Sequence, residues 1–283
     1  MLKKYLEQWA LVPDGAEIIT PNGQLLPVRY QNTPAMLKIA LPKDEELSSI
    51  TMEWWNGEGA ARVFKCEGNA LLMERAMGRN SLITMAQTPA GDEKASQILC
   101  EVAAKLHTPR NSPIPKTLLP LEKWFESLFV INTNEHDILK EASITAKTLF
   151  ATPQESVILH GDIHHGNVLD FNKRGWLAID PKHLIGERGF DFANIFCNPD
   201  AIDHTFNIAT QPGRLARQVT IVAKVANLPP KRLLQWILAY AGLSAAWLLE
   251  EKNLRAAKLP LTIATFALNE LKKISKSGFK LNI

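Results

Sequence analysis

The chain has 283 residues, of which 46% are hydrophobic and 22% are charged, as is ordinary for a globular protein. Lys and Arg number 32 and Asp and Glu number 29, so the net charge of +3 points to neither a nucleic acid nor a membrane as partner. Three cysteines without a CxxC spacing exclude a disulfide scaffold and fit a reducing compartment, the cytoplasm. The length allows one large domain or two small ones.

Residues 1–75 predict a β-rich lobe. The run Ala35–Leu41 is apolar apart from Lys38, which is typical of a strand buried on both faces and leaves the lysine in need of an explanation. A helix is expected over 43–55. Short apolar runs between turn residues predict strands at 16–20, 25–30, 35–41, 61–66 and 70–74.

Residues 76–283 predict a mostly helical lobe. The uncharged run Leu233–Leu249 is short for a membrane span and has charged flanks, so it predicts a buried helix. The first fifteen residues lack the apolar core of a signal peptide. Helices are expected at 92–107, 121–131, 135–150 and over most of the chain after 205, and the whole predicts an α+β fold.

The densest polar cluster lies between two short apolar strands, at 157–159 and 176–179. Asp162 and Asn167 are five residues apart, which is the D-x-x-x-x-N spacing of a kinase catalytic loop, and Asp180 follows the second strand. Phosphoryl transfer needs a carboxylate that accepts the hydroxyl proton, and hard oxygen ligands that hold Mg²⁺. Asp162 suits the first task, and Asn167 and Asp180 suit the second.

A phosphate clamp completes such a site, and Lys38 is the candidate. A buried ammonium group is tolerable beside a carboxylate and a bound polyphosphate. The carboxylate is expected from the following helix, where Glu46 is favoured and Glu45 and Glu53 are rivals.

The histidines of the same segment allow a second interpretation. His160, His164 and His165 lie within six residues with Asp162, as in a zinc site of a metal-dependent hydrolase. Adjacent ligands in one short loop are difficult to aim at one ion, and zinc would not explain Asn167. A catalytically silent nucleotide-binding module is the third alternative. His160 is expected to support the loop.

The motif HGDxHxxN at 160–167, with IDPK at 179–182 and GxxxFDFAN at 186–194, resembles the aminoglycoside phosphotransferase family. The likeness is greatest to its streptomycin 6-kinase and hydroxyurea phosphotransferase branch, and supporting pieces extend over residues 35–200. It implies a bilobal protein-kinase-like fold with ATP between the lobes. A small antiparallel-sheet N-lobe (1–75) would carry the phosphate clamp, and a larger, mostly helical C-lobe (76–283) would carry the catalytic loop.

The resemblance also implies residue roles. Asp162 would be the catalytic base, and Asp191 would tie the catalytic loop in place. The backbone from Glu74 to Ala76 would hold adenine. No GxGxxG precedes Lys38, so the turn at 21–23 would have to cover the phosphates. Asn167 and Asp180 would be the Mg²⁺ ligands and Lys38 would reach the α- and β-phosphates.

The expected function is an ATP- and Mg²⁺-dependent phosphotransferase acting on a hydroxyl group of a small molecule. A cationic aminoglycoside such as streptomycin is favoured, because residues 180–203 hold five acids against two bases. Asp200 and Asp203 are the candidates for contacting it. Hydroxyurea, which needs no such acids, and an unidentified metabolite stay open, as does the oligomeric state.

Overall fold

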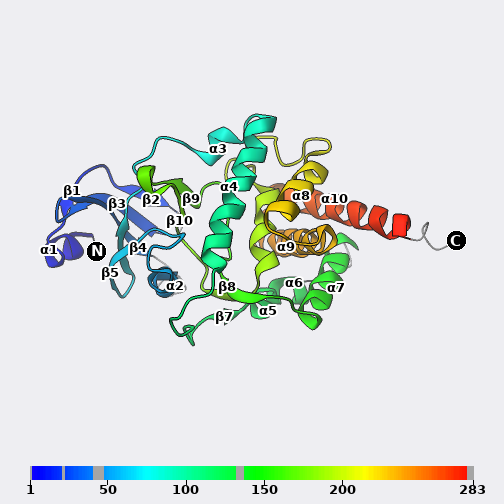
Figure 1. Ribbon diagram of the computed structural model, residues 1–283, viewed down its shortest axis with the longest axis horizontal. Helices are drawn as coiled ribbons and strands as arrows, with labels where there is room; N and C mark the ends of the chain where they lie inside the picture. The colour runs from blue at the N-terminus through cyan, green and yellow to red at the C-terminus, as the bar shows by residue number, and fades with distance from the viewer. Residues whose placement is uncertain (1, 21–22, 41–47, 132–136, 279–283) are drawn as a thin grey trace.

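The N-terminal sheet is antiparallel, with β4 in its centre between β3 and β6 (Figure 1). The computed structural model describes residues 2–20, 23–40, 48–131 and 137–278. The strand order is β1-β3-β4-β6-β5, and β2 pairs with β3. The elements of this lobe are α1 (Leu2–Gln8), β1 (Val12–Pro13), β2 (Ile18–Thr20), β3 (Gly23–Tyr30), β4 (Thr33–Ala40), α2 (Ser48–Trp55), β5 (Val63–Glu67) and β6 (Ala70–Glu74).

The two faces of the sheet have different partners. Leu37 and Ile39 of β4 are fully buried in a cluster with Tyr5 and Trp9, so α1 and the segment after it cover one face. Lys38 lies between them in sequence, and successive side chains of a strand point to opposite faces. Lys38 therefore faces the helical lobe. The strand pattern that singled out Lys38 is confirmed.

The hairpin between β3 and β4 is tighter than the sequence predicts. Tyr30 pairs with Thr33, so the loop is Gln31 and Asn32 alone. Both have a positive φ, at 48° and 64°, as a two-residue turn that follows the twist of the strands requires. The segment expected to interrupt the strands is thus a tight turn, and β4 begins two residues before the predicted start.

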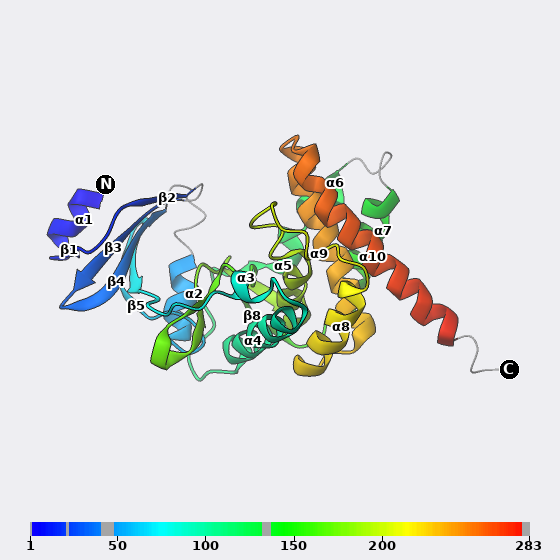
Figure 2. The ribbon, with the colours of Figure 1, turned by 90° about the horizontal axis from the view of Figure 1, so that it is seen from above.

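The C-terminal lobe is mostly helical, and Figure 2 shows it beside the sheet with α10 along its far side. The segment expected as one helix at 121–131 is two short helices, because Phe125 leaves the helical conformation at φ −90° and ψ 5°. The elements are α3 (Leu82–Met85), α4 (Pro89–His107), β7 (Leu119–Pro120), α5 (Leu121–Trp124), α6 (Glu126–Val130), α7 (Asp137–Ala151), β8 (Ser156–Leu159), β9 (Val168–Asp170), η2 (Asn172–Arg174), β10 (Trp176–Ala178), β11 (Leu184–Glu187), η3 (Arg188–Phe192), η4 (Asn194–Cys197), α8 (Arg214–Val225), α9 (Pro230–Glu250) and α10 (Leu254–Gly278).

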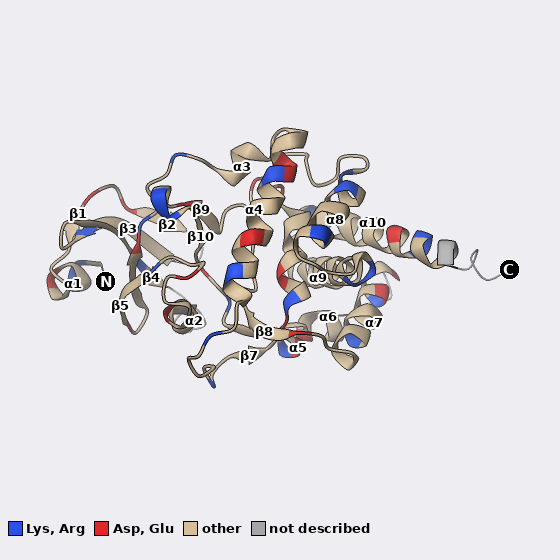
Figure 3. Cartoon of the chain, in the orientation of Figure 1, with Lys and Arg blue, Asp and Glu red and all other residues tan. Residues whose placement is uncertain are grey.

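Helix α9 is the central helix of this lobe. Among the described helices it alone is long and apolar enough to cross a membrane, but 67% of its apolar stretch is buried inside the protein. It packs closely on α7, since a Cβ added to Gly242 would lie 2.3 Å from the Cβ of Ala142. The prediction of a buried helix is confirmed. Figure 3 shows charges of both signs interspersed along both lobes.

Two small β-structures present the polar cluster at the boundary between the lobes. β8 pairs with β11, and β9 pairs with β10 in a hairpin. The segment 160–167 connects β8 to β9, and Asp180 lies two residues after β10. The Ile179 amide donates to the Asn167 carbonyl oxygen at 2.9 Å, which brings the two loops together.

Candidate active site

Asp162 is a partly exposed carboxylate in a fixed position. One oxygen, Oδ1, accepts a hydrogen bond from Asn194 Nδ2 at 2.8 Å. Asn167 Nδ2 donates to the Asp162 backbone oxygen at 3.0 Å and lies 3.4 Å from Oδ2. Lys182 Nζ is 3.5 Å from Oδ2. The side chain keeps 25% of its surface exposed, so it is held from several sides and still reachable by a bound molecule.

The loop at residues 160–167, predicted to be the catalytic loop and given that name below, is anchored by Asp191. Its buried carboxylate accepts hydrogen bonds from the amides of His160 and Gly161, at 2.9 and 2.7 Å. His107 Nε2 donates the third, at 2.8 Å. Burial alone would raise the pKa of Asp191, but the hydrogen bond and charge of His107 and the loop amides hold it below its usual value. The carboxylate therefore remains charged and fixes the start of the loop.

His160 connects the catalytic loop to the strand before Asp180. Its Nε2 donates to the Ile179 carbonyl oxygen at 2.8 Å, and its Nδ1 accepts from the Asp162 amide at 3.2 Å. The ring stacks on Trp55 with 6.1 Å between the ring centres. Burial lowers the pKa of His160, which keeps the ring neutral with one donor and one acceptor.

Lys38 and Asp180 meet across the boundary between the lobes. Lys38 Nζ lies 2.5 Å from Asp180 Oδ1 although 142 residues separate them. Burial tends to raise the pKa of Asp180, and the Lys38 ammonium overcomes this and lowers it. Asp180 has φ 65°, a left-handed conformation that is uncommon for a residue other than glycine and recurs at functional sites.

The expected partners of Lys38 from the following helix divide into two groups. Glu45 and Glu46 lie outside the described residues. Glu53 is exposed on α2. The carboxylate that the described part of the chain places on Lys38 is Asp180, which sequence reasoning assigned to magnesium alone.

The segment after β6 connects the lobes. Glu74 directs its side chain to Arg174 of η2 in an ion pair, so the part left for a ligand is its backbone. The Ala76 amide makes no hydrogen bond to any residue that the structure describes. Beside it is an apolar cluster from both lobes, with Met36, Leu71, Met73, Leu169, Phe171, Leu177 and Ile179 among its members.

The other histidines of the catalytic loop do not form a zinc site. His164 Nδ1 accepts from the Gly166 amide at 3.0 Å, and its Nε2 is 3.7 Å from Asp162 Oδ1. His165 is buried, and neither ring nitrogen has a hydrogen-bond partner among the described residues. Burial lowers its pKa to about 3. Within ranges 2–20, 23–40, 48–131 and 137–278, no three His, Cys, Asp or Glu residues are placed to hold a metal.

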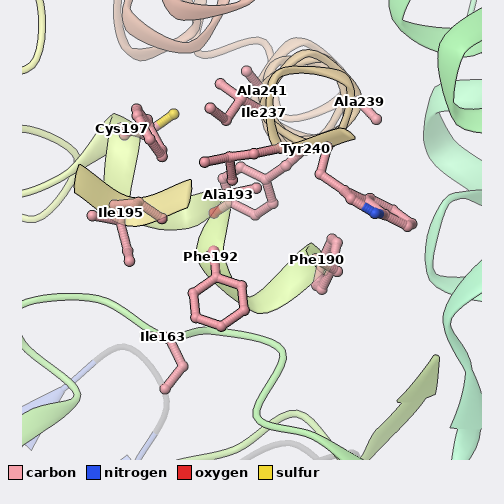
Figure 4. Close-up of a cluster of buried hydrophobic side chains, with 14 of the residues drawn as sticks. Ile163, Phe190, Phe192, Ala193, Ile195, Cys197, Ile237, Ala239, Tyr240 and Ala241 are labelled. Atoms are coloured by element: carbon pink, nitrogen blue, oxygen red, sulfur yellow. The ribbon is translucent and has the colours of Figure 1, made fainter. Parts of the chain in front are cut away.

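A pocket of about 330 Å³ is lined by residues of η4, α9 and α10 and of the segments between them. Cys197 of η4 and Tyr240 of α9 line it, and η4 also carries Asn194, the donor to Asp162. Burial raises the pKa of Tyr240, and the Asp162 charge raises it further. Figure 4 shows Phe192 between Ile163 and the side chain of Tyr240, which projects from α9, with Ile195 of η4 to one side. We call this space the C-lobe pocket; its lining is Cys197, Ala201, His204, Tyr240, Ser244, Trp247, Leu248, Glu251, Asn253, Ala256, Leu259 and Pro260.

The two acids expected to contact a substrate are engaged with their own loop. Asp200 is buried and accepts hydrogen bonds from the amides of Ile208 and Ala209. Asp203 accepts from the amide and the hydroxyl of Thr205. The carboxylate among the residues of the C-lobe pocket is Glu251. Asp200 lines an adjoining pocket of about 590 Å³, and His204 and Asn253 line both.

Four residues of the site escaped sequence reasoning as functional residues. Lys182 ends the IDPK motif and Asn194 ends the GxxxFDFAN motif, but the sequence does not reveal that both side chains lie next to Asp162. His107 is 84 residues from Asp191, and Glu251 follows the long core helix. The sequence signal for His107 is its place in the last turn of α4.

The chain matches a family model over residues 8–252, described as aminoglycoside/hydroxyurea antibiotic resistance kinase. A streptomycin 3''-kinase of Klebsiella pneumoniae is 50% identical over 242 residues, covering 86% of this chain and 90% of the relative. A streptomycin 6-kinase of Streptomyces glaucescens is 26% identical and a hydroxyurea phosphotransferase of Kitasatospora aureofaciens 24% identical, each covering at least 92% of this chain.

Solved structures show the same fold at low identity. An aminoglycoside phosphotransferase in a ternary complex with ADP and hygromycin B has a TM-score of 0.66 at 13% identity, covering 94% of this chain and 97% of its own. An amicoumacin kinase bound to AMP-PNP and Ca²⁺ has a TM-score of 0.64 at 14% identity, covering 96% and 93%. The expected α+β protein-kinase-like fold is confirmed. This chain, a small-molecule kinase, belongs to the aminoglycoside/hydroxyurea antibiotic resistance kinase family.

Proposed function

We propose that this kinase uses Mg²⁺ and ATP to phosphorylate a hydroxyl group of streptomycin, at the 3'' position. What supports the proposal is the fixed and partly exposed carboxylate of Asp162, together with the C-lobe pocket: the short helix η4 lines that pocket with Cys197, and its Asn194 donates to Asp162. The 50% identical streptomycin 3''-kinase supports the choice of acceptor. We also place the protein in the cytoplasm, since Cys100 and Cys197 are buried thiols without a disulfide.

The nucleotide would bind between the lobes. Lys38 faces this space with its cross-strand neighbours Leu25 and Leu71, so an ammonium group and apolar side chains line one wall. The Ala76 amide offers a donor to the adenine ring, and the Glu74 backbone oxygen an acceptor. The apolar cluster shared by the lobes would receive the flat faces of the base.

The residues assigned to Mg²⁺ fit that ion. Asn167 commits its Nδ2 to the Asp162 backbone, and its Oδ1 makes no hydrogen bond to the described residues. Asp180 gives Oδ1 to Lys38, and its Oδ2 is the second oxygen donor. Mg²⁺ prefers such hard oxygen ligands together with water and substrate phosphates. When bound, the ion would neutralise charge on the phosphates.

Asp162 would orient the acceptor hydroxyl and take its proton. Asn194 holds Oδ1, which leaves Oδ2 toward Lys182 and the exposed side of the loop. A general base must come within about 2.6–3.2 Å of the proton donor. The partial exposure of Asp162 permits that approach, and its hydrogen bonds to two asparagines fix its direction.

The size and charge of the C-lobe pocket favour an aminoglycoside over hydroxyurea. The pocket holds about 330 Å³ and adjoins a second of about 590 Å³, far more than hydroxyurea fills. Glu251 is the acidic residue of the C-lobe pocket, and no Lys or Arg is among its lining residues, whereas Arg255 and Lys258 line the adjoining pocket. Tyr240 and Trp247 offer rings for a cationic group. These features suit a positively charged sugar.

The test is phosphorylation by the purified chain with Mg-ATP, with streptomycin and hydroxyurea as separate acceptors. We expect ADP release that depends on streptomycin, and phosphorus NMR of the product should place the phosphate at 3''. Asp162→Asn should lower kcat about 10²–10⁴-fold and leave ADP binding unchanged. Asp137→Asn, an exposed carboxylate at the start of α7, is the matched control. Nucleotide binding without turnover of either acceptor would contradict the proposal.

A further inference from the structure

Lys182 is a cation beside the catalytic carboxylate to which no role has been given. Its Nζ lies 3.5 Å from Asp162 Oδ2, and its charge also acts on Asp180. The backbone is fixed, because the Lys182 amide donates to the His160 carbonyl oxygen at 2.7 Å. The Lys182 side chain is 24% exposed and that of Asp162 is 25% exposed, so a bound molecule can reach both.

The catalytic loop itself supplies no fixed positive charge at this place. Two residues after Asp162 stands His164, whose Nδ1 accepts a hydrogen bond from the Gly166 amide. Burial lowers the pKa of His164, so the ring is neutral. Lys182, from the loop after β10, places its ammonium where the catalytic loop has none. Lys38 meets Asp180 from the other lobe.

Distances put the Lys182 ammonium within reach of the reaction. An acceptor oxygen lies about 2.6–3.2 Å from its base, and reacting atoms approach to about 3–3.5 Å before the bond forms. A group 3.5 Å from the base and carried on a flexible four-carbon stem can therefore contact the transferred phosphoryl group.

We propose that Lys182 is a catalytic residue that hydrogen-bonds the transferred phosphoryl group and neutralises charge on it in the transition state. The role rests on the proposed function. In the step, the acceptor oxygen forms the new bond to the γ-phosphorus and gives its proton to Asp162. The bond from that phosphorus to the bridging oxygen breaks, and its electron pair leaves with ADP. Lys182 keeps its own protons and donates hydrogen bonds to the phosphoryl oxygens.

A merely structural role predicts different behaviour. If Lys182 only balanced the charges of Asp162 and Asp180, its loss would weaken binding of ADP and of transition-state analogues alike. A catalytic role predicts that binding of ADP stays the same and that the added affinity for an analogue of the transferred group disappears. Mg-ADP with aluminium fluoride, which imitates that group, separates the two cases.

The experiment compares wild type with Lys182→Met, Lys182→Arg and Lys173→Met by calorimetry, with Mg-ADP alone and with aluminium fluoride. Lys173 is exposed on η2 and serves as the matched control. In the wild type and the control, aluminium fluoride should tighten ADP binding about 10²-fold or more. Lys182→Met should lose that gain and lower kcat about 10²–10³-fold, and Lys182→Arg should recover part of both.

Equal losses of ADP affinity with and without aluminium fluoride in Lys182→Met would overturn the role, as would a kcat within threefold of wild type. A wild type that gains nothing from aluminium fluoride would overturn it as well. A third outcome separates the two proposals. If aluminium fluoride tightens ADP binding in the wild type but not in Lys182→Met, and the wild type phosphorylates no aminoglycoside, the role of Lys182 is supported and the proposed acceptor is refuted. The binding measurement needs no acceptor, so the two proposals fail separately.

Discussion

Replacing Asp191 by Asn should loosen the catalytic loop, because the carboxylate serves three donors. Oδ1 accepts from the Gly161 amide, and Oδ2 accepts from the His160 amide and from His107. An asparagine offers one oxygen, so its NH₂ group must face one of the two loop amides. Whichever way it turns, one buried backbone N–H loses its acceptor.

The structure allows the magnitude to be worked out. An unsatisfied buried donor costs about 1–3 kcal/mol, and the remaining bonds lose their charge assistance, so Asp191→Asn should lower the free energy of unfolding by about 2–4 kcal/mol. Urea unfolding followed by tryptophan fluorescence measures this. We also expect kcat to fall more than KM rises, because Gly161 adjoins Asp162.

The pH dependence gives a second test of the same contact. The folded pKa of Asp191 is below its usual value near 4, so the unfolded chain binds the proton more readily in that range. The stabilisation is therefore present above about pH 4 and is lost as the pH falls through the lower folded pKa. Asp191→Asn should lack this loss. Surface substitutions usually change the free energy of unfolding by no more than about 0.5 kcal/mol. A change as small as that in Asp191→Asn would refute the reasoning.

Three further outcomes follow from contacts in the structure. Asp92→Asn should lower the free energy of unfolding by about 3–5 kcal/mol in urea, because it leaves the buried Arg214 guanidinium without its paired carboxylate. Glu251→Gln should raise KM for streptomycin about two- to fivefold and leave KM for ATP unchanged, as steady-state assays will show, since an exposed ion pair contributes little. Asp180→Asn should raise the Mg²⁺ concentration for half-maximal activity about tenfold or more in a magnesium titration, because the negatively charged one of the two proposed ligands becomes neutral.

The sequence predicts most of the N-terminal sheet, since strands with alternating burial and clear turn residues leave a local signal. Lys38 could be found because charge is unusual inside an apolar strand. Helix α1 was missed: its seven residues are too few for a strong periodic pattern, and its helicity depends on packing Tyr5 against the sheet. Strands β7 and β11 pair side by side from distant parts of the chain, which no local pattern reports.

The candidate site could be predicted only where its residues follow one another closely. Asp162, Asn167 and Asp180 lie within nineteen residues and are brought together by one short hairpin. His107 comes from a helix far away in sequence. A count of acids selected Asp200 and Asp203, but it could not reveal that backbone amides of their own loop already occupy those carboxylates.

Helix η4 has a consequence for how such kinases acquire new substrates. Asn194, at its start, holds the Asp162 carboxylate, and Cys197, at its end, lines the C-lobe pocket. Under the proposed function, this one short turn would determine where an acceptor hydroxyl stops, and residues of α9 and α10 would determine which molecule enters. Mutations on those two helices would then change which acceptor is recognised without moving Asp162. The fold would thus separate the residues that hold the reacting carboxylate from those that select the acceptor.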